Sequence, residues 1–198
     1  IPQFDTPIVE THCHLDYLAE EALEDALNAA TAVGIERIVT IAVSAGNLDT
    51  VQQIAADHDQ VWCTQGIHPH EADSWSHELS ERIAASCGNA KVVAIGEIGL
   101  DYHYDHADRR AQAAAFDAQL HIASEASLPV VIHTREADED TRAILANHSQ
   151  ALRHKGVIHS FTSSLSLAEF CLGEGFMLGF NGIITFRNAD NVRAVADA

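Results

Sequence analysis

Two histidines separated by a single residue, His12 and His14, follow a short apolar run near the start of the chain. Alternate residues of an extended strand point to the same side, so both imidazoles can face one point just past the strand. Imidazole is a common metal ligand, and this spacing therefore suits a metal site. Taken alone, the pair is equally compatible with a structural role.

Four later apolar runs also end on a histidine or a glutamate, at His68, Glu97, His133 and His159. Core packing explains this repetition poorly, because a carboxylate at the end of a buried strand needs a partner. Mixtures of imidazole and carboxylate suit Zn, Mn or Fe, whereas sites richer in carboxylate and water suit Mg. The pattern therefore predicts a metal centre.

We expect this centre to hold two divalent ions, Mg, Mn or Zn, with Glu97 bridging them. His12 and His14 would bind the first ion, and His133 and His159 the second. Two ions ~3.5–4 Å apart activate water and stabilise both oxygens of a displacement. Taken alone, His133 has an equally good explanation as a core histidine bonded to the backbone.

Two further residues, His68 and Arg135, are candidates for contacts with substrate. His68 ends an apolar run and could contact a phosphate or assist the leaving group. Arg135 lies two residues beyond His133, where a guanidinium could grip a phosphate with two hydrogen bonds. The alternative for Arg135 is a salt bridge to Glu136 or Asp138.

The elements that position these residues alternate between strand and helix along the whole chain. Apolar runs predict strands at 7–14, 35–43, 61–67, 91–97, 130–133, 157–160 and 176–180. Ala- and Leu-rich segments predict helices at 18–33, 48–58, 76–87, 107–127, 138–147, 165–172 and 188–198, and 98–105 is expected to be an extended loop. Such alternation is typical of parallel strands joined by crossover helices.

Seven such units indicate a TIM-type (β/α)8 barrel without its final strand-helix unit, formed by a single domain over residues 1–198. Complete barrels typically need about 250 residues, and their active sites lie at the carboxyl ends of the strands. A doubly wound open sheet is the competing architecture, but it would not bring six strand ends to one point. We expect the first and seventh strands to keep unpaired edges.

The composition limits the environment and the partners of the protein. The net charge is −18, with only two lysines, and such a surface repels polyanions. Nucleic acid would therefore have to be held by bound metal and a few arginines. The sequence has no ~20-residue apolar span and no leader-like start, so we expect a cytoplasmic protein. Its four cysteines lack CxxC spacing, and we expect their thiols to be reduced. No membrane or obligatory protein partner is expected.

Several ordered stretches resemble the signature blocks of the TatD family of metal-dependent deoxyribonucleases. They cover residues 9–16, 66–70, 96–102, 128–137, 159–162 and 182–189. The resemblance implies an amidohydrolase-like barrel that hydrolyses phosphodiester bonds in DNA with divalent cations, commonly as a 3′–5′ exonuclease. It also implies that the metal ligands are His12, His14, Glu97, His133 and His159.

The chain departs from that family pattern at two places. Glu10 stands where an aspartate is usual before the His-x-His motif. Family members also carry an aspartate after the eighth strand, which binds the first metal, and neither Asp190 nor Asp197 fits that role. By the resemblance, the site lacks one ligand and its general base.

Two alternative functions remain open from the sequence. The same barrel could hydrolyse a small amide or ester, although such enzymes often bridge their metals with a carboxylated lysine, and neither Lys91 nor Lys155 ends a strand. The shortened barrel could instead bind metal or a partner without catalysis. Metal-dependent nuclease activity of the 198-residue chain would distinguish this last alternative from the other two.

Overall fold

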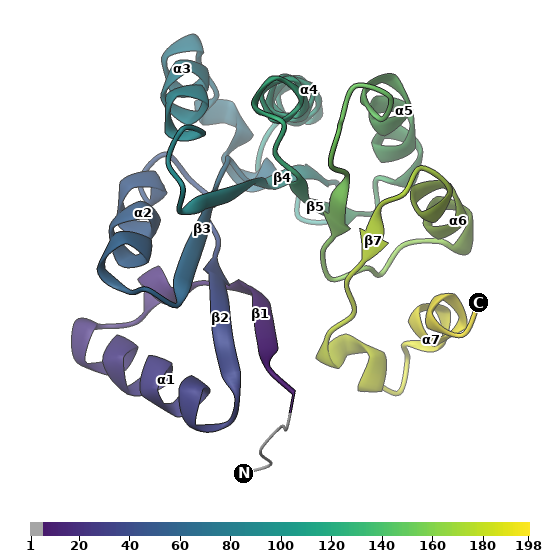
Figure 1. Cartoon of the computed structure of the whole chain (residues 1–198). Coiled ribbons are helices and arrows are strands. Elements are labelled where there is room, and N and C mark those ends of the chain that lie inside the picture. The colour runs from purple at the N-terminus through teal and green to yellow at the C-terminus, as the bar shows by residue number, and fades with distance from the viewer. Residues whose placement is uncertain (1–5) are drawn as a thin grey trace.

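Seven parallel strands form one sheet in which neighbours in sequence are also neighbours in space. The computed structural model describes residues 6–198, and in it the sheet curls so that the helices lie along its outer face (Figure 1). The strands are β1 (Ile8–Cys13), β2 (Ile35–Thr40), β3 (Val61–Gln65), β4 (Val92–Asp101), β5 (Val130–Arg135), β6 (Gly156–Ile158) and β7 (Met177–Leu178). This is the barrel-like α/β fold expected from the sequence, and it is incomplete.

The helices connect successive strands and cover the sheet from outside (Figure 1). They are α1 (Glu20–Ala32), α2 (Leu48–Asp57), α3 (His77–Ser86), α4 (Arg109–Ala126), α5 (Asp138–His148), α6 (Leu165–Gly173) and α7 (Asp190–Ala196). Short 3-10 helices follow three strands, namely η1 (Leu15–Tyr17), η2 (Pro69–Ser74) and η3 (Gly182–Thr185). No helix in the described part of the chain is long and apolar enough to cross a membrane.

The sheet is open between β1 and β7, which are its two edge strands. Figure 1 shows this opening between the purple N-terminal strand and the yellow C-terminal segment. Apolar side chains remain exposed at these edges, including Val9 on β1 (48%) and Met177 on β7 (66%). The expected unpaired edges are therefore present among the described residues.

The main difference from the predicted elements lies in β4, where residues 98–101 continue the strand instead of forming a loop. The strand seemed to end at Glu97 because a carboxylate interrupts the apolar run. A register irregularity between Ile95 and Ile98 carries the backbone past Glu97, and pairing with β5 continues to Asp101 and Arg135. Ile98 is fully buried, so the continuation is stabilised by packing as well as by the sheet.

Two glycines allow β4 and β5 to approach closely. Gly99 has a φ of +137°, and a Cβ there would lie 1.9 Å from the carbonyl oxygen of His133. A Cβ on Gly96 would lie 2.6 Å from Cβ of Val131. Any side chain at Gly99 would therefore be strained and would also displace the backbone of a candidate ligand.

Candidate metal centre

The candidate residues lie at one mouth of the curled sheet, within the strands or shortly after them. His12 is on β1, Glu97 on β4 and His133 on β5. His14 and His159 directly follow β1 and β6, and His68 is the third residue after β3. Parallel strands in a barrel place their carboxyl ends on one face. The predicted convergence of these side chains is therefore what the fold produces.

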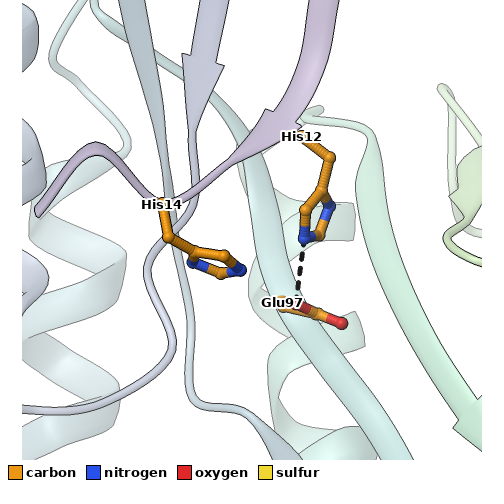
Figure 2. Close-up of side chains that lie close together, drawn as sticks. All are labelled: His12, His14 and Glu97. Atoms are coloured by element: carbon orange, nitrogen blue, oxygen red, sulfur yellow. Dashed lines mark ion pairs between the residues drawn. The ribbon is translucent and has the colours of Figure 1, made fainter. Parts of the chain in front are cut away.

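The Glu97 carboxylate is at the centre of this arrangement. One oxygen, Oε2, lies 3.2 Å from Nε2 of His12, and Figure 2 shows His14 beside this pair. The other oxygen, Oε1, lies 3.2 Å from Nδ1 of His133 and 3.9 Å from Nε2 of His68. The two oxygens thus face two different sets of imidazoles.

Potential ligand atoms form two groups, each lying within 4.8 Å. One consists of His12, His14 and Glu97, and the other of His68, Glu97 and His133. Glu97 belongs to both, as a bridging carboxylate must. The ring of His159 instead stacks on His12, with centroids 3.3 Å apart and planes 8° from parallel. Its assignment to the second ion, beside His133, stays a prediction.

Two buried nitrogens show that the donor set fits a cation. Nδ1 of His12 and Nδ1 of His14 have no hydrogen-bond partner among the described residues. Buried polar atoms nearly always have a partner, so two such atoms beside an ionised carboxylate are consistent with a ligand that is not a protein group. Imidazole nitrogens and a carboxylate are suitable donors for a divalent metal.

The electrostatics of the mouth favour positive charge at its centre. Burial alone would raise the pKa of Glu97, but hydrogen bonds from His12 and His133 hold it well below its usual range. Burial lowers the pKa of His133, but hydrogen bonds to Asp101 and Glu97 outweigh this and raise it to about 9. The two carboxylates therefore attract a cation to the position of His133.

Two of the site imidazoles, His68 and His159, are held neutral, which is the form that binds metals. Burial lowers the pKa of His68 to about 3, despite the nearby Glu97. Burial also lowers the pKa of His159 to about 4, and the neighbouring His12 lowers it further.

Asp101 is a site residue whose role the sequence left open. It is fully buried, and its Oδ2 lies 2.8 Å from Nε2 of His133 and 3.1 Å from Nε2 of His70. Its Oδ1 accepts hydrogen bonds from the backbone N–H groups of His103 and Tyr104. Metal-bound imidazoles usually donate their second N–H to such a carboxylate, so Asp101 is suited to orient His133.

Two buried glutamines of α4 hold the backbone next to site residues, and the sequence analysis missed this role. Gln112 accepts from the N–H of Asp101 at 2.8 Å and donates to its carbonyl at 3.2 Å. Gln119 makes the same pair of bonds to Ile67, just before His68. Their seven-residue spacing places them on one helical face, and that spacing is the signal that could have revealed them.

Arg135 lies at the outer end of β5, two residues beyond His133. Its guanidinium carbon lies 4.8 Å from the centre of the Tyr104 ring. The alternative salt bridge to Glu136 or Asp138 is not found among the described residues, where Arg135 forms no ion pair. Its hydrogen-bonding groups are therefore not committed to a neighbouring carboxylate.

Comparison with known proteins agrees with this geometry. The family model for TatD related DNase matches residues 9–198. The chain is 34% identical to the uncharacterized metal-dependent hydrolase YabD of Bacillus subtilis over 189 residues, covering 95% of this chain and 74% of the relative. It is 36% identical to the uncharacterized metal-dependent hydrolase YcfH of Escherichia coli K12 over 194 residues, covering 96% and 72%.

A relative with a more specific name and a solved structure extend the comparison. The 3′-5′ ssDNA/RNA exonuclease TatD of Erwinia tasmaniensis is 36% identical over 159 residues, covering 80% of this chain and 61% of that protein. The crystal structure of YJJV, a TatD homologue from Escherichia coli, superposes with a TM-score of 0.87 at 32% identity and covers 95% of this chain and 73% of that one. The chain therefore belongs to the TatD family of metal-dependent hydrolases.

Proposed function

We propose that this protein removes nucleotides from the 3′ end of DNA by hydrolysing phosphodiester bonds with two divalent ions, Mg, Mn or Zn. The observation that carries the proposal is the position of Glu97, whose two oxygens face separate groups of imidazoles. The name of the Erwinia relative, an exonuclease of single-stranded DNA and RNA, supports the choice of substrate.

The ligands would divide between the two ions around Glu97. His12 and His14 would hold the first ion, because both lie in the same ligand group as Glu97. His133 and His159 would hold the second. When bound, such ions lower the pKa of a water ligand and neutralise the charge of phosphate oxygens.

His68 is better suited to contact the substrate than to bind the second ion. Its Nδ1 accepts a hydrogen bond from the backbone N–H of His70 at 3.2 Å, and its lowered pKa keeps the ring neutral. A neutral ring with an accepting Nδ1 carries its proton on Nε2. That N–H can donate to a phosphate oxygen, whereas a metal would need a free electron pair at this atom.

Arg135 would bind a phosphate of the substrate strand. Its guanidinium forms no ion pair with residues 6–198, in a chain with a net charge of −18, and a guanidinium can bind phosphate with two parallel hydrogen bonds. Asp101 would fix the ring orientation of His133 through its 2.8 Å contact. These roles belong to residues that lie along β4 and β5, the most buried part of the sheet.

Neither lysine is placed to bridge metals as a carboxylated side chain. Lys91 Nζ donates to three carbonyls, those of His58, Asp59 and Val61. Lys155 Nζ donates to the carbonyl of Ser149. Amidohydrolase chemistry of the lysine-bridged kind therefore finds no support among these contacts.

Replacement of Glu97 tests the proposal. Glu97→Ala and Glu97→Gln should both abolish nucleotide release from a 3′-labelled single-stranded oligonucleotide with Mn²⁺, Mg²⁺ or Zn²⁺, and should lower the metal content measured by mass spectrometry. Glu169→Gln, on the exposed side of α6, is the matched control and should retain both. Release by either Glu97 variant at more than half the wild-type rate would contradict the bridging role.

A further inference from the structure

A second cavity lies beside the candidate metal centre, with a volume of about 780 Å³. It is formed by the end of β5, by the segment that follows β6 and by the region of α7. Eight of its ten lining residues have polar side chains, and those that matter for its chemistry are Arg135, Glu136, Asp138, Ser163, Asn188 and Asn191. This volume falls in the range of small-ligand sites.

The two cavities are lined by consecutive stretches of the same two segments. The cavity at the metal centre, about 680 Å³, includes His133 from β5 and His159 and Ser160 from the chain after β6. The second cavity begins two residues further along each segment, at Arg135 and Thr162. A linear substrate that leaves the metal centre along these segments would therefore enter the second cavity.

The charges of the second cavity favour a phosphate near Arg135. Tyr104 supports the guanidinium through its ring, a contact that leaves the N–H groups available. Of the two carboxylates in the lining, Glu136 already pairs with Nδ1 of His103 at 2.7 Å. Asp138 already accepts a hydrogen bond from the N–H of Ser164 at 2.9 Å. The arginine is the one charged group of this lining without such a partner among the described residues.

A buried hydroxyl in the lining also lacks a partner. Ser163 is 9% exposed, and its Oγ forms no hydrogen bond with any described residue. It lies just before α6, whose N-terminal end favours negative charge. An unpartnered buried hydroxyl is unusual in a protein, so this atom is suited to bind a polar ligand group.

We propose that this second cavity binds the nucleotide next to the one at the metal centre, with Arg135 on its phosphate. Ser163 and the two asparagines provide hydrogen bonds for the sugar or the base. This inference rests on the proposed nuclease function, because it extends the path of the same substrate strand. It assigns a subsite to residues outside the metal ligands.

The subsite can be tested by the length of a single-stranded substrate. The wild-type chain should cleave (dT)3 with a kcat/KM about tenfold higher than (dT)2, because a third nucleotide adds a charge-assisted contact. Asn188→Asp, which places a carboxylate in the second cavity, should remove this gain, and Arg135→Gln should do the same. Asn28→Asp, on exposed α1, adds the same charge elsewhere and should preserve the gain.

Binding measured without turnover separates this proposal from the nuclease proposal. In EDTA, the fluorescence anisotropy of labelled (dT)3 should show about tenfold weaker binding to Asn188→Asp than to Asn28→Asp. If the wild-type chain cleaves neither oligonucleotide, the nuclease proposal fails and the anisotropy still decides the subsite. Equal kcat/KM values for (dT)2 and (dT)3, or equal binding by the two aspartate variants, would overturn the subsite.

Discussion

The fourth and seventh strands of the sheet differ in both length and burial. In β4, nine of ten residues are buried, and two of them are the carboxylates Glu97 and Asp101. In β7 there are only two residues, and Met177 is 66% exposed. The two carboxylates that contact the site histidines through their side chains thus lie on the most buried strand. On the open edge, Glu10 of β1 lines the same cavity but accepts a hydrogen bond from the backbone N–H of His12.

The site therefore combines residues that are held firmly by their surroundings with residues on a less constrained strand. Asp101 and His133 are held by close backbone packing at Gly99 and by the hydrogen bonds of Gln112. His12 comes from β1, which is an edge strand. A fixed carboxylate centre surrounded by a less constrained edge can keep its charge geometry while the mouth adapts to ligands.

The largest loss of stability is expected when a side chain is added between β4 and β5. Gly99→Ala should lower the free energy of unfolding by about 4 kcal/mol, because it combines backbone strain with overpacking. Urea unfolding followed by circular dichroism measures this change. Gly173→Ala, at a position with nothing within 4 Å, is the control. A Gly99 variant as stable as that control would mean that the two strands are not closely packed.

A second prediction compares truncation of an apolar side chain at the centre and at the edge. Ile132→Ala on β5, where the side chain is fully buried, should cost about 3 kcal/mol of stability. Met177→Ala on β7 should cost about 0.5 kcal/mol or less, as exposed positions usually do. The same urea titration serves both. Similar losses at the two positions would remove the distinction between centre and edge.

The hydrogen bonds from Gln112 to the backbone of Asp101 provide a sharper test of how β4 is held. Gln112→Leu should cost about 2 kcal/mol, because it leaves the N–H and carbonyl of Asp101 buried without their partners. It should also reduce metal affinity, measured by calorimetric titration, because Asp101 would no longer be held toward His133. Gln53→Leu, on the solvent side of α2, is the control. Unchanged affinity in the Gln112 variant would show that Asp101 is positioned by other contacts.

The smallest effect is expected at the open edge itself. Val9→Lys on β1 should change stability by about 0.5 kcal/mol or less, but it should reduce any self-association through the unpaired strand, since lysines disfavour edge-to-edge pairing. Sedimentation velocity over a range of protein concentrations measures this. If the wild-type chain and the variant sediment identically as associated species, the association uses another surface.

The sequence was sufficient to predict the alternation of strands and helices and which strands carry His12, Glu97 and His133, although β4 and β5 extend beyond their predicted ends. Each of these side chains follows or interrupts a local apolar run, so its position depends on neighbours in sequence. Asp101 was not recognised because pairing with β5, a long-range interaction, extends β4 beyond Glu97. The hydrogen bond between Gln119 and the backbone of Ile67 is likewise a contact between distant segments.

The sequence also could not predict which histidines of the site contact one another. Spacing along a strand could place His133 and His159 near one another only through the general geometry of a barrel. The stacking of His159 on His12 and the backbone hydrogen bond that fixes the tautomer of His68 depend on side-chain rotations. Such rotations follow from the packing of the whole mouth, which no short motif contains.

The stacked rings of His12 and His159 have a consequence for how the protein folds. They join the first strand to the segment after the sixth, so most of the chain must be in place before they meet. Contacts between such distant parts of a chain form late, because the entropy of closing the intervening loop must be overcome first. During refolding, metal uptake at His12 should therefore lag behind the burial of the hydrophobic core, and the affinity for metal would report when the chain has finished folding.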